Sequence, residues 1–366
     1  MIFFSGHELK SYLDDSKSKQ FSEKRDIYDD INKHIHDKTA YHIAALYGLR
    51  RTGKSALMEQ LIRCNQDYDY TALIVCSKKD SIDDLYDVLD KNKCIKFFYI
   101  DEITRMDDFF EGCNVLADVY ANKGKKIVIA GANSLELRLA QGHGLHDKIE
   151  LFHTTYIPFG EYQRILNGTI DDYIESGGTL TDGEVFESFE KCTEYINAAI
   201  TDNMLHGLMQ LYKQRELSFA LGELLCNDQA ETYVNKFIES YNRKFAEEII
   251  DGKFDFRDVF NASDCMWSNR KNDRIAEELQ KLLIEMDVIY PAADEGEMIF
   301  LQPGMRYAQL KWIFNSLRKT KAWKEIPHDE KAAVEKQLKH KSKKKMLDDI
   351  LYLESLMKVN KQNADG

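Results

Sequence analysis

A loop early in the chain has the residue types and spacing of a phosphate-binding site. It matches the pattern G-x-x-x-x-G-K-[ST] with the run Gly48-Leu49-Arg50-Arg51-Thr52-Gly53-Lys54-Ser55. The two glycines let the backbone curl and point successive N–H groups at an anion. Lys54 supplies a compact positive charge for the β- and γ-phosphates, and the Ser55 hydroxyl can ligate Mg²⁺. A helix expected from Ala56 onward adds an N-terminal dipole that favours the same anion.

The alternative is a surface turn that is merely rich in glycine and base. Its surroundings argue against this, because an apolar stretch of strand length precedes the loop and a segment suited to a helix follows it. We therefore predict that residues 48–56 hold the phosphates of a nucleotide. Arg50 and Arg51 either help to hold phosphate or a neighbouring carboxylate, or they are solvated.

Two acidic residues follow a second apolar stretch. Phe97–Ile100 has the composition of a buried strand, and Asp101 and Glu102 come directly after it. At the end of such a strand, Asp101 can hold Mg²⁺ through water, and Glu102 can act as the general base for an attacking water. A strand that ends in Asp-Glu often just turns into solvent, but its position behind the phosphate loop favours the functional interpretation. The pair indicates hydrolysis, because kinases that act on small molecules need no such pair.

A third polar side chain is expected at the same edge of the sheet. The apolar stretch Ile127–Ala130 is followed by Gly131-Ala132-Asn133-Ser134. The Asn133 amide could face the γ-phosphate and orient the attacking water, which makes it a candidate catalytic sensor. Asparagine is also a favoured helix N-cap, so the alternative is that Asn133 caps a helix that begins near Leu135.

The segments around these residues alternate between strand-like and helix-like patterns, after a first stretch, residues 8–38, that is expected to be helical. Such alternation predicts an α/β fold with a parallel sheet core covered on both faces, and the phosphate loop makes it a P-loop NTPase. Runs such as Leu73–Val75, apolar at consecutive positions, are typical of doubly buried strands. The expected strands are Tyr41–Tyr47, Thr71–Cys76, Lys96–Ile100, Lys126–Ala130 and Ile149–Ile157, and the expected helices are Lys54–Cys64, Ser81–Leu89 and Phe109–Lys123.

Beyond about residue 165 helical spacing dominates, and a winged helix is expected near the end of this region. An amphipathic helix, Asp273–Met286, is followed by two short apolar runs, Val288–Tyr290 and Met298–Leu301, with a polar tip at Asp294–Glu297. The helix and the tip are acidic, whereas DNA binding requires Lys or Arg on the approaching face. We therefore predict a protein-contact or packing module rather than a DNA reader.

Three domains are expected along the chain. Residues 1–165 would hold the phosphate loop and an N-terminal helix, residues 166–317 the helical and winged-helix part, and residues 318–366 a basic helical tail.

Composition narrows the class of protein further. The 366 residues carry a formal net charge of −12. The chain shows neither a signal-peptide pattern nor an apolar run that could span a bilayer. We therefore expect a cytoplasmic protein without membrane contact. Residues 318–345 depart from the acidic balance with eleven Lys/Arg against four Asp/Glu. A solvated face is the favoured interpretation of this stretch, although it is also the best candidate for a DNA contact.

The seven cysteines include no Cys-x-x-Cys pair, so a zinc site is not expected. Cys76 and Cys94 lie in or beside apolar segments and are expected to be reduced and buried.

With these residues assembled, the chain resembles a family of bacterial and archaeal AAA-type P-loop ATPases. The resemblance implies an ATPase core of the ASCE or AAA-like type, then helical and winged-helix regions, and in many members a restriction-endonuclease-like domain. The matching segments are Leu46–Ser55, Phe97–Glu102, Gly131–Leu135 and Pro158–Tyr162, with further similarity at Tyr173–Gly178 and Leu301–Arg306.

Two departures from the family pattern change what is expected of this chain. The family carries an arginine shortly before the Pro-Phe segment, where this chain has Lys148, so the trans-acting or sensing role of that arginine does not carry over. Arg138 and Arg164 are the other candidates for such a role. Lys345–Glu354 is similar to the entry helix of the nuclease-like domain, but the remaining strands and acidic ligands of a nuclease do not follow, so we expect no DNA cleavage by this chain.

The leading hypothesis is a Mg²⁺-dependent ATPase whose nucleotide state moves its C-terminal part. The alternative is a switch that binds ATP tightly, turns it over little, and displays the winged helix to a partner, either another protein, a second copy or DNA. A small-molecule kinase is disfavoured because no substrate lid or acceptor motif is visible. No guanine-reading Asn-Lys-x-Asp motif occurs, which favours ATP over GTP.

Overall fold

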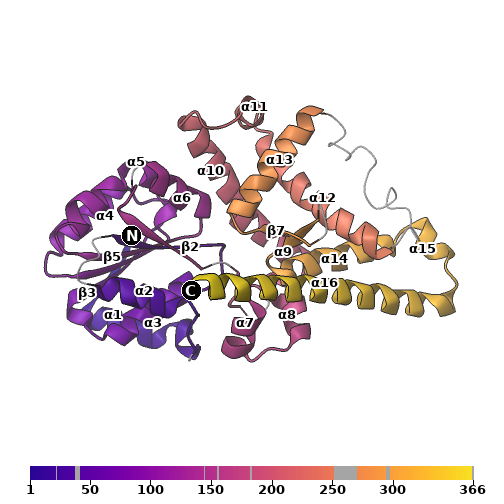
Figure 1. Cartoon of the computed structure of the whole chain (residues 1–366), viewed down its shortest axis with the longest axis horizontal. Helices are drawn as coiled ribbons and strands as arrows, with labels where there is room; N and C mark the ends of the chain where they lie inside the picture. Colours follow the sequence, from indigo (N-terminus) through magenta and orange to yellow (C-terminus); the bar gives the residue numbers. More distant parts are fainter. Residues whose placement is uncertain are drawn as a thin grey trace. The chain divides into compact units, whose positions relative to one another are not determined.

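The computed structural model of the chain describes residues 1–21, 23–37, 42–143, 145–154, 156–181, 184–250, 270–293 and 297–364. It has two compact units (Figure 1). The first comprises Met1–Tyr156 and Gln163–Asn167, and the second Ile157–Tyr162 and Gly168–Gly366. The domain limits inferred from the sequence remain a prediction.

The first unit is built on a six-stranded sheet with the order β1-β3-β4-β5-β2-β6. Strand β1 runs antiparallel to β3, and all the other neighbouring strands are parallel. This arrangement confirms the predicted α/β class with a parallel sheet core. The strands are β1 Ile2–Ser5, β2 Ile43–Tyr47, β3 Thr71–Val75, β4 Phe97–Asp101, β5 Lys126–Gly131 and β6 Ile149–His153.

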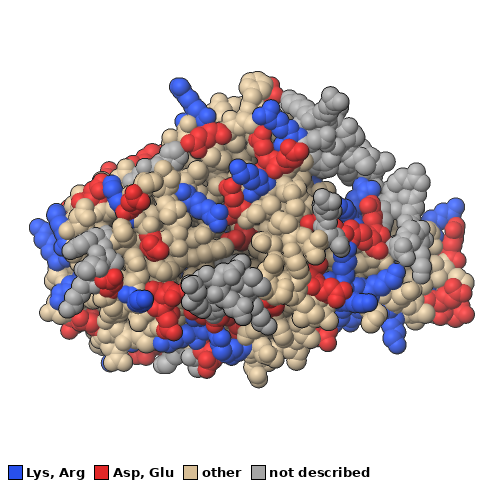
Figure 2. Space-filling view, viewed as in Figure 1, with Lys and Arg blue, Asp and Glu red and all other residues tan. Residues whose placement is uncertain are grey.

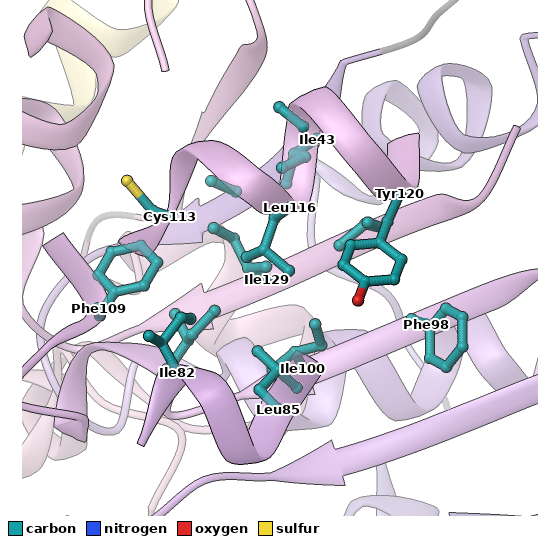
Figure 3. Close-up of a cluster of buried hydrophobic side chains, with 14 of the residues drawn as sticks. Ile43, Ile82, Leu85, Phe98, Ile100, Phe109, Cys113, Leu116, Tyr120 and Ile129 are labelled. Atoms are coloured by element: carbon teal, nitrogen blue, oxygen red, sulfur yellow. The ribbon is translucent and has the colours of Figure 1, made fainter. Parts of the chain in front are cut away.

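Both faces of this sheet are covered, because its central strands are apolar on both sides. On one face, Phe98 and Ile100 of β4 pack with Leu85 of α4 and other buried residues (Figure 3). On the other face, Tyr99 packs among side chains from α1, α2 and α3, such as Leu57. The helices of this unit are α1 Gly6–Asp15, α2 Tyr28–His36, α3 Lys54–Asn65, α4 Ile82–Lys91, α5 Phe109–Gly112 and α6 Ser134–His143, with a π-helical segment Leu116–Ala121 after α5.

The N-terminal part differs from the expected single helix over residues 8–38. It contains α1, a 3₁₀ turn at Lys17–Gln20, and α2 as separate elements. Helix α1 ends because Ser16 is extended and its hydroxyl hydrogen-bonds the Leu13 carbonyl and the Glu59 carboxylate of α3. The edge strand β1, which pairs Phe3 with Ile74, was not predicted.

Two further expectations need correction. The predicted helix Phe109–Lys123 is divided, because α5 ends at Gly112. The Ile82 side chain packs closely against this glycine, and a Cβ added at position 112 would lie 2.6 Å from it. Cys76 is buried as expected, but Cys94 is exposed, because it lies in the turn before β4 rather than in the strand.

The second unit is mainly helical and contains one two-stranded antiparallel sheet, in which Ile289 of β7 pairs with Phe300 of β8. The helix and the hairpin predicted near the end of this region are both present. The hairpin tip at residues 294–296 lies outside the described residues. The assignment of the helix and hairpin as a winged helix remains a prediction. The elements are α7 Phe159–Leu166, which belongs to the first unit from Gln163 on, α8 Ile170–Ser176, α9 Phe189–Ile196, α10 Asp202–Lys213, α11 Phe219–Cys226, α12 Ala230–Ile250, α13 Arg270–Glu285, β7 Ile289–Pro291, β8 Met298–Phe300, α14 Pro303–Leu317, α15 Lys321–Glu325 and α16 His328–Ala364.

Much of the basic stretch 318–345 belongs to the long helix α16, and part of it is neutralised inside the second unit. Lys343 forms ion pairs with Asp171 and Glu175 of α8, at 2.5 and 3.1 Å. Lys345 pairs with Glu248 of α12 and Glu297. Figure 2 shows basic and acidic side chains interspersed on the visible face. Among the described residues, no helix is both long enough and apolar enough to span a membrane.

Candidate nucleotide-binding site

The glycine- and lysine-containing loop leaves the fully buried strand β2 and leads directly into α3. Gly48 and Gly53 have φ angles of 149° and 88°, which other residue types rarely adopt. Arg51 also has a positive φ, 64°, and is exposed, whereas Arg50 is half-buried. The backbone therefore has the curled conformation that the glycine spacing predicted.

The Lys54 side chain is buried beneath this loop, with 7% of the residue exposed. Its Nζ donates hydrogen bonds to the carbonyl oxygens of Gly48 and Leu49, both at 2.7 Å. Burial lowers the pKa of Lys54 to about 8, although the carboxylates of Glu102 and Asp101 favour the charged form. The ammonium group thus stays mostly protonated at neutral pH and lies where it can attract an anion.

Asp101 ends strand β4 beside the start of α3. Burial raises the pKa of its carboxyl group to about 6, although the nearby Ser55 side chain and the Lys54 ammonium group favour the charged form. A serine hydroxyl next to a carboxylate is a pair of hard oxygen donors, the type of ligand that Mg²⁺ takes in nucleotide sites. The residues therefore fit the metal that the sequence pattern implies.

Glu102 has an unusual backbone conformation directly after Asp101. Its φ is 57°, in the left-handed region that is unfavourable for a residue with a Cβ. Its N–H donates to Oδ1 of Asp101 at 2.9 Å. Its Oε2 is buried and has no hydrogen-bond partner. A buried carboxylate oxygen without a partner is well suited to accept a proton or a hydrogen bond from a water molecule.

Strand β5 lies between β2 and β4 and therefore brings Asn133 to the same edge of the sheet. The Asn133 Oδ1 accepts a hydrogen bond from the Glu136 N–H at 3.2 Å, so the side chain caps α6. This is the capping interaction that the sequence left open as the alternative. The Asn133 Nδ2 lies 3.4 Å from Oε2 of the buried Glu136. The capping contact does not test a second role toward nucleotide.

Arg25 contacts the backbone of the phosphate loop and was not identified from the sequence. It is 5% exposed and donates hydrogen bonds to the carbonyl oxygens of Thr52, at 2.5 Å, and Thr154, at 2.9 Å. The Thr52 and Thr154 hydroxyls are 3.1 Å apart, and Thr154 bonds to the Tyr47 carbonyl. The loop is thus tied to the ends of β2 and β6. Arg25 precedes α2 in a polar stretch, and nothing in its local pattern signals this contact.

The candidate arginine-finger residues Arg138 and Arg164, and Lys148 in place of the family's arginine, all have interactions within the first unit. Arg164 pairs with Asp26 at 2.7 Å. The Arg138 guanidinium lies 5.3 Å from the centre of the Tyr47 ring. Lys148 pairs with Asp118 at 2.8 Å.

A comparison with protein families agrees with this geometry. Residues 40–163 match the model of a family described as AAA domain. The match covers about a third of the chain and includes the loop, the Asp-Glu pair and Asn133. No curated protein matches the chain.

Several solved structures are similar to the chain at low identity. They include AMPPCP-bound DnaA from Aquifex aeolicus (15% identity, 86% of this chain and 93% of that chain, TM-score 0.30). The Holliday junction branch migration motor RuvB of Thermotoga maritima matches at 14% identity, over 81% and 92% of the two chains, with a TM-score of 0.32. Cdc6p from Pyrobaculum aerophilum matches at 11%, over 86% and 96%, with a TM-score of 0.31. Similarities this low do not bear on the function of this chain.

The contacts of Arg25 generate a first prediction. We expect Arg25→Ala to weaken binding of a non-hydrolysable ATP analogue about tenfold, because two buried carbonyls lose a charged donor and the loop loosens. Isothermal titration calorimetry measures the affinity. Lys24→Ala, which removes a neighbouring exposed cation, is the control and should leave the affinity unchanged. Equal affinities for Arg25→Ala and the wild type would show that the loop does not depend on Arg25.

The raised pKa of Asp101 generates a second prediction, for protein free of metal and nucleotide. With a pKa of about 6 in the native state and 3.8 ordinarily, Asp101 binds more proton in the folded than in the unfolded chain between about pH 4 and 6. Its contribution to the free energy of unfolding therefore falls as pH rises through this range. Asp101→Asn should raise that free energy by about 2 to 3 kcal/mol at pH 7.

Urea denaturation in EDTA, followed from pH 4 to 7, measures this effect. Asp107→Asn, which replaces an exposed acid, is the control and should behave as the wild type. A wild-type protein and an Asp101→Asn variant of equal stability at pH 7 would contradict the burial argument.

Proposed function

Taking residues 40–163 as an AAA-type domain, we propose that the protein binds ATP together with Mg²⁺ and hydrolyses the ATP. The observation that supports this best is the buried Lys54 ammonium group, whose charge the carboxylates of Glu102 and Asp101 stabilise. A phosphate-loop cation and two carboxylates at the end of β4 therefore converge at the N-terminus of α3. Such convergence is what phosphoryl chemistry requires, since it depends on positioning and on charge stabilisation.

The proposed roles follow from the contacts. The loop N–H groups of residues 48–56 and Lys54 hold the phosphates, and Ser55 and Asp101 hold the metal. Bound Mg²⁺ would neutralise charge that develops on the phosphate oxygens. Glu102 accepts a proton from the attacking water through its unpartnered Oε2. Asn133 orients that water through its amide nitrogen while its Oδ1 continues to cap α6.

We further propose that the nucleotide state changes the arrangement of the second unit, where a winged-helix module formed by α13, β7 and β8 would contact a protein partner. The division of the chain into two units supports this coupling.

The alternative is a switch that binds ATP and turns it over slowly. The interactions of Arg164 with Asp26 and of Lys148 with Asp118 favour it, because side chains engaged within their own unit are less available to stabilise a transition state at a neighbouring copy. In that case the bound nucleotide, rather than its hydrolysis, would control the partner.

A third prediction concerns turnover. Glu102→Gln should lower steady-state phosphate release from Mg²⁺–ATP by at least about 100-fold, because the amide cannot accept the proton, while affinity for ATP is retained. Glu150→Gln, an exposed acid on β6, is the matched control and should release phosphate at the wild-type rate. Undiminished turnover in Glu102→Gln would exclude Glu102 as the base. Tight binding without turnover in the wild type would favour the switch.

A fourth prediction concerns coupling between the units. Small-angle scattering of Glu102→Gln should differ between the nucleotide-free and the Mg²⁺–ATP-bound protein, because that variant is expected to hold ATP without cleaving it. Lys54→Ala, which loses the phosphate-binding ammonium, should give the same profile in both conditions. Identical profiles for Glu102→Gln with saturating ATP would contradict the coupling.

A further inference from the structure

The second unit contains a pocket of about 560 Å³, and none of the residues that line it belongs to the proposed ATP site. It is bounded by α14, α15 and α16, three consecutive helices that are neighbours in Figure 1. The volume lies within the range of pockets that take small organic ligands. None of the roles proposed above uses this space.

The inner wall of the pocket is apolar. Leu310 of α14 and Leu338 of α16 are 1% and 6% exposed, and Trp323 of α15 is 5% exposed. Phe314 adds a second aromatic ring. An apolar wall with aromatic side chains favours binding of a ligand, because it removes the hydrocarbon part of that ligand from water.

The rim of the same pocket is basic. It carries four cations against a single acid, Glu335, whose carboxylate pairs with Arg318 at 2.8 Å. Lys336 and Lys339 come from one face of α16, because residues three or four apart along a helix lie on the same side. The four cations are Lys311, Arg318, Lys336 and Lys339. A local excess of positive charge on a chain of net charge −12 selects for an anion.

We propose that this pocket binds a small anionic amphiphile, a compound with an aromatic or aliphatic body and a carboxylate, sulfonate or phosphate head. The body covers Leu310, Trp323 and Leu338, and the head lies among the lysines of the rim. Long lysine side chains suit this role, since their stems pack along apolar surface while the ammonium groups reach the anion.

The shape of the pocket favours a small ligand over nucleic acid. A duplex presents its phosphates on a rigid backbone and is bound by cations spread along a face. Here the cations surround a concave apolar wall that a phosphate backbone would leave uncovered. The basic character of residues 318–345 is thereby assigned, in part, to a ligand pocket.

The probe for the test is 8-anilinonaphthalene-1-sulfonate, which joins an apolar ring system to one anionic head. We expect the bound dye to accept excitation energy from Trp323, so that Trp323→Phe lowers the energy transfer. The neutral analogue N-phenyl-1-naphthylamine should bind at least about tenfold more weakly, because it lacks the anionic head.

Two matched pairs of variants locate the site. Ala332→Phe fills the pocket, whereas Ala333→Phe places the same ring at an exposed position that does not line it. The double variant Lys336→Glu/Lys339→Glu reverses two rim charges, and Lys324→Glu/Lys331→Glu makes the same change outside the pocket. The first member of each pair should weaken dye binding at least about tenfold, and the second should leave it unchanged. Circular dichroism establishes that each variant is folded.

Three outcomes would overturn the proposal. Dye affinity that is equal in Ala332→Phe and Ala333→Phe would place the dye elsewhere. Equal affinities for the anionic and the neutral dye would remove the role of the lysines. The third outcome is that the anionic dye fails to bind, whereas a duplex oligonucleotide binds and its binding is lost in Lys336→Glu/Lys339→Glu. This result would assign the rim to nucleic acid.

Discussion

A buried ammonium group constrains the whole first unit. Removing the Lys54 charge from water is costly, and it is tolerated because the carboxylates of Asp101 and Glu102 and two carbonyl oxygens of the loop surround it. The loop and the two carboxylates belong to segments far apart in the sequence. They meet only because parallel strands end at one edge of a sheet, and β5 keeps the ends level by pairing Ile129 with both Ala45 of β2 and Ile100 of β4.

The sequence was most informative where the chemistry is local. The phosphate loop and the Asp-Glu pair each lie within a few residues, and the backbone requirements of the loop show in its two glycines, Gly48 and Gly53. Arg25 could not be found in this way, because its partners Thr52 and Thr154 are distant in the chain and offer only main-chain oxygens. The strand β1 was not predicted for a related reason, since a short segment such as Ile2–Ser5 becomes a strand only when the edge of β3 is available to pair with it.

The ambiguity at Asn133 has a physical origin. An amide at the end of a strand and at the start of a helix can serve the helix with its oxygen and another group with its nitrogen, so the cap and the sensor are compatible. The structure shows the first contact and leaves the second as a proposal. The basic stretch was ambiguous because a count of charges cannot distinguish its members. Lys343 faces acids of α8, whereas Lys336 and Lys339 lie on the rim of a pocket.

Helix α16 also shows how a single element can serve several neighbours. Its length brings Lys343 to α8, Lys345 to α12, and Asp349 to the buried Arg306 of α14, with 3.3 Å between the last two side chains. Burial raises the pKa of Asp349 to about 6 even though Arg306 opposes the change. Much of the internal organisation of the second unit therefore depends on contacts with this helix.

The backbone of Glu102 has a consequence for how this chain would respond to selection. Its left-handed conformation suits glycine or asparagine better than glutamate, so either replacement would relax the main chain. A laboratory screen for heat resistance alone would then tend to discard the glutamate. A chain that keeps Glu102 retains a locally unfavourable backbone conformation. Substitutions at position 102 that raise the stability of the fold would therefore also remove the proposed catalytic base.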